Sequence, residues 1–279
     1  MTAHWWHVSV SCRPEDTDLV AAAIVAATGH GVEEPEPGVL STALPTEDDA
    51  KALAGELALR FDGLEASVTA LEPVDWTVRW RDGIATRRFG RLIITPSWLP
   101  VEPAGDDVVV VLDPESAFGS GEHGSTRAAL TLLERHLRPG QVVLDFGSGS
   151  GILAIAAARL GADRAVGIEV DDSANPIAEA NARRNGVADR VTFLEGDAAE
   201  MHRLVGPAQL VCSNILRIVN VLLLPAIREA LAPDGIAVFS GMESTERELF
   251  LPELERAGWR PVDEVHDADW WAIAARRPA

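Results

Sequence analysis

The sequence is short of cysteine. Only Cys12 and Cys212 occur among its 279 residues, and neither stands in a Cys-x-x-Cys pair. This count excludes a disulfide framework and gives no support to a zinc site built on cysteines. So few cysteines are typical of proteins in the reducing cytosol, so we expect a cytoplasmic protein.

Long apolar runs are also missing. No uninterrupted apolar stretch approaches the roughly 20 residues that a membrane-spanning helix needs. The opening residues MTAHWWHVSV lack the basic region and the long apolar core of a secretory signal. The sequence therefore predicts neither a membrane anchor nor export.

Positive charge is scarce, because 43 acidic residues stand against 24 basic ones and the formal net charge is −19. Such a surface repels phosphate backbones, which clustered Lys and Arg usually bind. We therefore expect no direct nucleic-acid binding, and a cationic partner suits this surface better.

One basic stretch interrupts the acidic composition: DWTVRWRDGIATRRFGRL, residues 75–92. Its arginines could form a patch that meets RNA or an acidic partner. We favour a plainer interpretation, a connector over residues 73–107 whose arginines pair with acidic side chains around them. The arginines are Arg79, Arg81, Arg87, Arg88 and Arg91.

Residues 1–72 are predicted to form a small α+β domain of ferredoxin type. Apolar residues alternate in HWWHVSVSC and then recur at helical spacing, and the second helix pattern opens at Thr46, a candidate N-cap. The order of the patterns matches a split βαββαβ unit. Because its first 70 residues are strongly acidic, this domain offers a surface for a basic substrate.

Residues 108–279 are predicted to form a doubly wound, mainly parallel α/β domain. Strand patterns of the buried type alternate with helix patterns, and residues 262–277 should supply the last strands. The buried-type strands are QVVLDF, RAVGIEV, RVTFLEGD, AQLVCSNI and GIAVFSG.

The stretch VVLDFGSGSGILAIA, residues 142–156, predicts a nucleotide-binding loop between a strand and a helix. Ile152 stands where the dinucleotide fingerprint G-x-G-x-x-G needs its third glycine. Asp145 precedes the loop glycines Gly147 and Gly149, where its charge would crowd a pyrophosphate but suit an ammonium or sulfonium ion. S-adenosylmethionine carries both cations and no phosphate, so we predict it as the cofactor. In isolation, the loop could also be only a packing turn.

Polar residues follow the next three predicted strands. A carboxylate at Glu169 could accept hydrogen bonds from both ribose hydroxyls, an arrangement that NAD-binding proteins also use. Asp197 could reach an adenine amino group, and Asn214 follows the fourth strand. A single Asn or Asp that follows a strand usually only forms a turn. Polar residues at successive strand ends favour a binding site instead.

A glycine-rich loop, LDPESAFGSGEHGST at residues 112–126, precedes the sheet. It could fold over a bound cofactor, with Thr126 or the following helix N-terminus meeting the cofactor carboxylate. Ser125 or Thr126 is predicted to cap that helix. His123 has no second His or Cys at ligand spacing, so we predict no metal site.

These motifs resemble the PrmA family, the bacterial ribosomal protein L11 methyltransferases, whose loop reads approximately L-D-P-x-x-A-F-G-T-G-x-H-P-T-T. The similarity continues through VLDFGSGSGILAIAAARLGADRAVGIEVD and NARRNGV to SNIL, and it includes DWTVRWRDGIATRRFGRLIITPSW. It spans most of residues 75–279, whereas residues 1–70 match mainly in predicted topology.

The resemblance implies a seven-stranded class I S-adenosylmethionine-dependent methyltransferase domain at 108–279, preceded by a substrate-recognition domain. The implied substrate is a basic ribosomal protein, methylated on lysine ε-amines, on the N-terminal α-amine, or on both. Thr126, Gly147, Glu169 and Asn214 match family residues that contact the cofactor, with Glu169 standing where Asp is usual.

Three residues depart from the family pattern. Arg217 replaces the alanine of N-I-L-A and, unless it turns outward, puts a cation near a site for a cationic substrate. Gly124 replaces the loop proline and is expected to loosen the loop, while Glu122 adds a carboxylate that could attract an ammonium. These departures leave the methylated protein open: a small-molecule or another protein-lysine methyltransferase of the same fold is the alternative.

Methyl transfer from a sulfonium is an in-line displacement that requires a neutral amine roughly 3–3.5 Å from the methyl carbon. A free lysine, with a pKa of about 10.4, is mostly protonated at neutral pH, so the site must favour the neutral form. We predict that the Asn214 carbonyl orients the amine. No residue is predicted to act as a catalytic acid or base.

Overall fold

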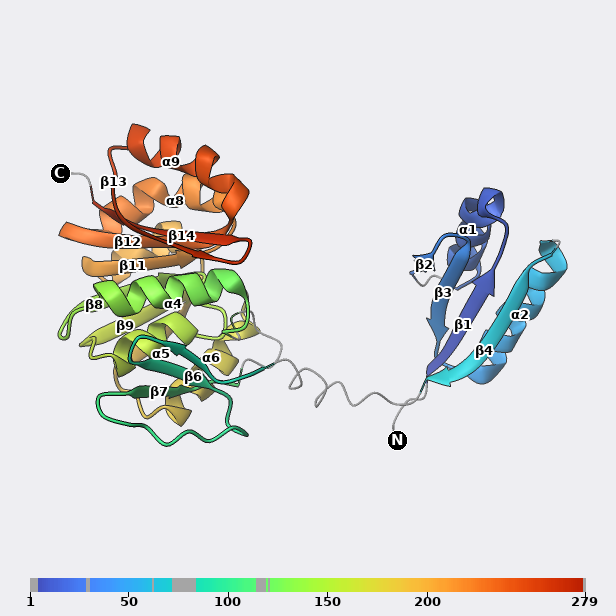
Figure 1. Cartoon of the computed structure of the whole chain (residues 1–279), viewed down its shortest axis with the longest axis horizontal. Coiled ribbons are helices and arrows are strands. Elements are labelled where there is room, and N and C mark those ends of the chain that lie inside the picture. Colours follow the sequence, from blue (N-terminus) through green and yellow to red (C-terminus); the bar gives the residue numbers. More distant parts are fainter. Residues whose placement is uncertain are drawn as a thin grey trace. The chain divides into compact units, whose positions relative to one another are not determined.

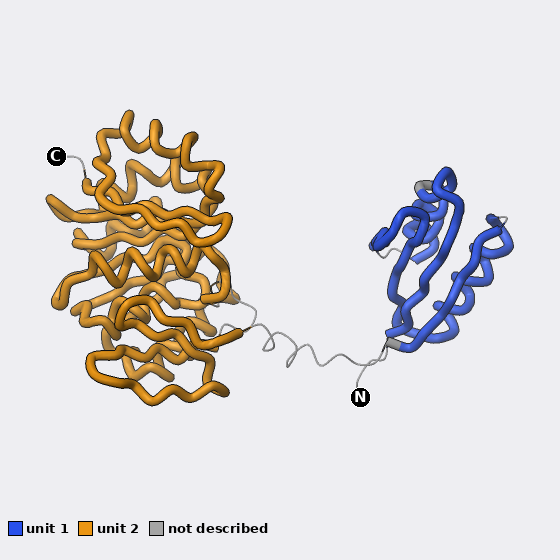
Figure 2. Tube along the Cα trace, in the orientation of Figure 1, with its two compact units in different colours: residues 1–81 blue, residues 82–279 orange. Residues whose placement is uncertain are grey.

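The computed structural model describes residues 5–28, 31–61, 63–71, 84–113, 119 and 121–277. The chain divides into two compact units, residues 1–81 and 82–279 (Figure 2). Within the described residues, no helix combines the length and the apolar character that crossing a bilayer requires.

The first unit has the predicted ferredoxin-like topology. Its antiparallel sheet has the order β2-β3-β1-β4, and the elements follow one another as β1-α1-β2-β3-α2-β4 (Figure 1). Thr46 caps α2 as predicted, because its hydroxyl accepts a hydrogen bond from the Asp49 backbone N–H at 3.1 Å. The bounds are β1 Trp5–Ser11, η1 Pro14–Asp16, α1 Thr17–Thr28, β2 Glu33–Glu36, β3 Val39–Leu44, α2 Glu47–Arg60 and β4 Glu65–Leu71.

The second unit is built on a seven-stranded sheet with the order β10-β9-β8-β11-β12-β14-β13. The first five strands in this order run parallel, and β14 pairs antiparallel with both β12 and β13. The predicted doubly wound, mainly parallel α/β fold is therefore confirmed. The strands are β8 Val142–Phe146, β9 Arg164–Glu169, β10 Val191–Glu195, β11 Ala208–Asn214, β12 Leu231–Glu243, β13 Arg260–Asp267 and β14 Trp270–Arg276.

Helices cover both faces of this sheet because its strands are apolar on both sides. One hydrophobic core joins the sheet to α4, α5 and α6, and a second core joins the opposite face to α7, α8 and α9 (Figure 1). The helices are α4 Gly124–His136, α5 Ile152–Arg159, α6 Ala174–Arg184, α7 Ala198–Met201, α8 Arg217–Ala230 and α9 Arg247–Arg256, with η2 His202–Leu204 and η3 Ser244–Glu246.

A small three-stranded sheet belongs to the second unit: β5 Arg87–Phe89, β6 Leu92–Thr95 and β7 Val108–Val111. Two of its strands lie inside the segment 73–107 that we interpret as a connector. Leu92 is fully buried in the core that α4 and α5 share, which explains why this stretch folds with the second unit.

The arginines of this segment pair with carboxylates, as the connector interpretation predicts. Arg87 contacts Glu122 at 2.7 Å, Arg88 contacts Asp107, and Arg91 reaches Glu134 at 3.9 Å. Arg79 and Arg81 lie outside the described residues. The described part of the segment thus presents ion pairs and not a row of unpaired cations.

Candidate cofactor and methyl-transfer site

The strand order reverses around β8, with β9 on one side and β11 on the other. Open α/β sheets bind ligands beyond the carboxyl ends of their strands at such a switch point. The glycine loop leaves β8 after Phe146, and β11 ends at Asn214, one residue beyond the partner of Phe146 in the sheet register. The fold therefore brings the predicted loop and strand ends to one edge.

The glycine loop leaves no room for side chains. Gly147 has a φ of +74°, which glycine adopts freely, and a Cβ built there would lie 2.7 Å from Cγ2 of Ile215. Gly151 has a φ of +81°, and its Cβ would lie 2.6 Å from the Phe193 ring. The backbone at the start of α5 therefore packs directly against Ile215 and Phe193, a contact that only glycine permits at these two positions.

Glu169 is held against this loop at the end of β9. Its Oε2 accepts a hydrogen bond from the Gly149 N–H at 2.9 Å, and its Oε1 accepts from the N–H groups of Val170 and Asp171. A carboxylate oxygen offers about two lone-pair sites, so Oε2 retains one for a ligand hydroxyl. This geometry is compatible with the ribose contact, which stays a prediction.

Asn214 and Thr126 are 88 residues apart in the chain and meet at this edge. The Asn214 Nδ2 donates to the Thr126 Oγ1 at 3.2 Å, and Thr126 is fully buried. The Oδ1 of Asn214 is also buried and has no hydrogen-bond partner among the described residues. A buried amide oxygen needs a donor, and an amine or ammonium group would supply one.

Asp145 is 1% exposed, and neither of its carboxyl oxygens has a hydrogen-bond partner within the described part of the chain. Burial is the main reason that the pKa of Asp145 is raised to about 8; the backbone N–H of Ala154 lowers this pKa, and the nearby charge of Glu169 contributes to raising it. A cationic ligand would stabilise the ionised form of this carboxyl. Among the described residues, the carboxyl oxygens of Asp145 and the Oδ1 of Asn214 lack hydrogen-bond partners. These buried acceptors beside the glycine loop fit the cationic groups of S-adenosylmethionine.

Asp145→Asn should make the unliganded protein more stable at alkaline pH. The raised pKa means that the folded protein binds this proton more tightly than the unfolded chain, so stability is lost as pH rises toward 8. The neutral amide removes this dependence. Between pH 6 and pH 8 the stability difference between variant and wild type should grow by roughly 2–3 kcal/mol in the variant's favour. Thermal melts at both pH values measure it, and a difference that does not change with pH would contradict the assignment.

Asp197 caps a helix. Its Oδ1 accepts a hydrogen bond from the Ala199 N–H at 2.8 Å at the start of α7, and the residue is exposed. The predicted contact with adenine is not excluded by this bond, since Oδ2 can still accept, and it stays a prediction. No group of three His, Cys, Asp or Glu side chains in the described residues is placed to hold a metal ion.

The segment before α4 differs from the prediction. Helix α4 begins at Gly124 with His123 at its N-cap, and Ser125 and Thr126 both lie in the first turn. The prediction that either residue caps this helix is wrong. Ser125 instead contacts the Nδ1 of His123 at 2.7 Å, and Thr126 faces Asn214.

Gly124 is a packing position. A Cβ built there would lie 2.5 Å from Cδ1 of Trp270 and 3.0 Å from the carbonyl oxygen of Asp267. The Asp267 carboxylate also accepts a hydrogen bond from Arg127 Nε at 2.8 Å. The turn between β13 and β14 is therefore seated on the start of α4, and Gly124 permits this contact. The expectation that Gly124 loosens the loop stays a prediction, because residues 114–118 and 120 of that loop lie outside the described residues.

Gly124→Ala should destabilise the second unit by about 1–3 kcal/mol, because the methyl group overlaps the Trp270 ring. Gly55→Ala in α2 is the matched control: no atom lies within 4 Å of its Cβ, so higher helix propensity should stabilise that variant. Denaturant unfolding compares the two. Adding Trp270→Ala to Gly124→Ala should recover part of the loss, whereas a stabilising Gly124→Ala would refute the contact.

The other two departures from the family pattern are engaged in ion pairs. Glu122 accepts hydrogen bonds from Arg87 at 2.7 Å and from the Ala85 N–H at 2.8 Å. The Arg217 Nε lies 3.2 Å from Oε1 of Glu246 in η3. Arg217 therefore brings no unpaired cation to the site, and the Glu122 charge is already compensated by Arg87.

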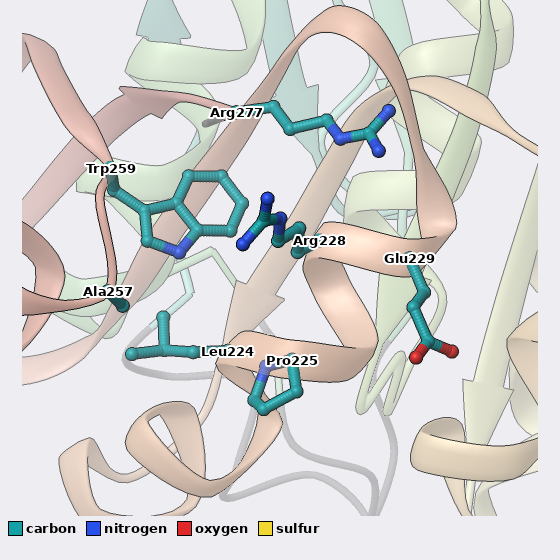
Figure 3. Close-up of a pocket in the computed structure, with 7 residues that line it drawn as sticks. All are labelled: Leu224, Pro225, Arg228, Glu229, Ala257, Trp259 and Arg277. Carbon is teal, nitrogen blue, oxygen red and sulfur yellow. The ribbon is translucent and has the colours of Figure 1, made fainter. Parts of the chain in front are cut away.

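A separate cavity of about 460 Å³ lies where the last turns of α8 meet the segment after α9 (Figure 3). None of the predicted site residues lines it. Its walls are Leu224, Pro225, Arg228, Glu229, Ala257, Trp259 and Arg277.

Known proteins resemble this chain in sequence and in fold. The model of the PrmA family, Ribosomal protein L11 methyltransferase, matches residues 37–278. The chain belongs to the PrmA family. Family membership and the seven-stranded fold together make it an S-adenosylmethionine-dependent methyltransferase. The cofactor contacts of the individual site residues stay predictions.

Relatives of this PrmA protein match from about two thirds to nearly the whole of its length. It is 34% identical to a ribosomal protein L11 methyltransferase of Pelotomaculum thermopropionicum over 308 residues, covering 99% of each chain. It is 40% identical to that of Thermus thermophilus over 203 residues, covering 73% of this chain and 78% of the relative. A solved ribosomal protein L11 methylase from Lactobacillus delbrueckii subsp. bulgaricus superposes with a TM-score of 0.63 at 28% identity, covering 70% of this chain and 99% of that one.

Proposed function

We propose that this PrmA enzyme methylates amines of a large-subunit ribosomal protein, L11, at lysine ε-amines, the N-terminal α-amine or both. The names of its relatives point to this substrate. The observation that carries the amine assignment is the buried Oδ1 of Asn214, which has no hydrogen-bond partner in the described part of the chain and lies beside Thr126 at the switch point. An amine N–H is a donor of the right kind for that oxygen.

S-adenosylmethionine supplies a methyl group bonded to a sulfonium sulfur. Asn214 orients the amine by accepting one of its N–H groups, so that the lone pair faces the methyl carbon. Thr126 holds the Asn214 amide in place through the 3.2 Å hydrogen bond. An amide adds no charge beside the sulfonium, and neither residue is a base, so the amine loses its proton to water.

We further propose that residues 1–72 recognise the substrate. The support is their acidic composition together with the exposed carboxylates of Glu33 and Glu36 on the edge strand β2. Long-range attraction to an acidic surface accelerates the encounter with a basic protein. A basic ribosomal protein has the complementary charge.

The test is incubation with labelled S-adenosylmethionine and ribosomal proteins from a strain that lacks the enzyme, followed by mass mapping. We expect label on amines of L11, and much less label when the chain starts at Asp82. Label on RNA would contradict the proposal, and so would label on free amino acids alone. Equal labelling by the shortened chain would contradict the role of residues 1–72 only.

A further inference from the structure

Four large apolar side chains are exposed at the start of α8, directly after Asn214. Their exposed fractions are 68% for Leu216, 63% for Ile218, 36% for Val219 and 73% for Leu222. We call this group the α8 stripe. Isolated exposed apolar residues are common, but a contiguous patch of them on a folded protein usually marks an interaction site.

The stripe occupies one face and one end of the helix. Ile218 and Leu222 are four residues apart and share a face, whereas Leu223 and Ile227 on the opposite face are buried in the core. Farther along α8, the exposed residues are Pro225 and then the charged Arg228 and Glu229, and all three line the cavity of Figure 3. The exposed Leu, Ile and Val side chains of α8 therefore lie in the turns nearest Asn214.

The start of α8 is held rigidly. Asn220 is fully buried, accepts a hydrogen bond from the Ser213 hydroxyl, and donates to the carbonyl oxygens of Ile215 at 3.0 Å and Ser240 at 2.9 Å. These bonds tie the first turn of α8 to the ends of β11 and β12. The stripe is consequently a preformed surface at a fixed position relative to Asn214.

An acidic turn contacts the segment of the stripe through one ion pair. Arg217, inside it, is paired with Glu246, and the same capping turn holds the exposed Glu243. The next helix, α9, adds the exposed Glu248 and the 57% exposed Leu249. An apolar surface with carboxylates at its edge suits a basic protein segment that also carries apolar side chains.

We propose that the α8 stripe docks the apolar side chains that flank the methylated amine in the basic protein substrate. This inference rests on the proposed function. An amine that reaches Asn214 brings its neighbouring residues past the beginning of α8, and burying the stripe removes apolar area from water in the complex. The carboxylates of Glu243 and Glu248 accommodate the basic charge of the same segment.

The experiment uses the full chain and compares Ile218→Gln/Leu222→Gln with wild type on L11. We expect the KM for L11 to rise roughly 10- to 100-fold, with kcat at saturation and S-adenosylmethionine affinity within about twofold. Leu204→Gln is the matched control, because Leu204 is 74% exposed and lies in η2, outside the stripe. It should keep the wild-type KM.

An unchanged KM for L11 in the double variant, with wild type active, would overturn the docking proposal alone. If the same variant also converts a dimer to a monomer in size-exclusion chromatography, a second copy of the chain covers the stripe instead. A kcat loss that accompanies a lowered melting temperature would indicate a structural role and would likewise overturn it. A wild type that methylates no ribosomal protein would overturn the proposed function and this inference with it.

Discussion

Gly147→Arg is expected to abolish S-adenosylmethionine binding. A Cβ at this position lies 2.7 Å from Cγ2 of Ile215, and a φ of +74° strains any residue other than glycine, so an arginine must displace Ile215 and distort the loop. Its guanidinium would also repel the cofactor's ammonium and sulfonium groups. Titration calorimetry should show no measurable heat of binding, and the variant should retain a cooperative thermal transition.

Gly140→Arg is the control that separates the loss of S-adenosylmethionine binding in Gly147→Arg from the effect of backbone strain alone. Gly140 has a φ of +83°, yet no atom lies within 4 Å of its Cβ, so this variant should lose stability and keep its affinity. Glu169→Ala should give an intermediate result, a loss of roughly 1–3 kcal/mol in binding if its carboxylate bonds the ribose. Wild-type affinity in both Gly147→Arg and Glu169→Ala would remove the cofactor from this loop.

Asn214→Ala is expected to lower the rate of methyl transfer about 100-fold while changing cofactor affinity only a few-fold. The reason is that the lost Oδ1 orients the nucleophile, an interaction that matters most in the transition state. Asn214→Asp should retain part of the activity, since a carboxylate can still accept from the amine. Single-turnover rates of methyl transfer and melting temperatures, measured for the same variants, distinguish an orienting role of Asn214 from a structural one.

The alternative for Asn214 is a structural role at the end of β11. In that case Asn214→Ala would lose stability through the broken bond to Thr126 and would transfer methyl groups at nearly the wild-type rate. Equal stability losses in the Ala and Asp variants, without a difference in their turnover, would support that structural role.

Features with a local cause were predictable from the sequence. Strand and helix periodicity is visible within about ten residues, so both folds could be predicted, whereas the short strands β5 and β6 inside residues 73–107 were not. Thr46 caps α2 because its hydroxyl reaches a backbone N–H only three residues away. Gly147 and Gly149 adopt positive φ angles, which glycine tolerates locally. Asp145, two residues before Gly147, predicts a cationic ligand.

Other features depend on residues far apart in the chain, and only the tertiary structure decided them. Arg127 and Asp267 are 140 residues apart, and together with Trp270 they make Gly124 a packing position, which the sequence did not indicate. The Arg217–Glu246 pair likewise neutralises a positive charge that the sequence alone placed near a site for a cationic substrate.

The sequence by itself determined which polar groups stand at the ends of the strands. It could not determine that Asn214 and Thr126 meet, that the Asn214 oxygen has no partner among the residues the structure describes, or that the α8 stripe is exposed. Burial and hydrogen-bond satisfaction are properties of the packed chain, because each depends on which distant side chains exclude water from a given atom.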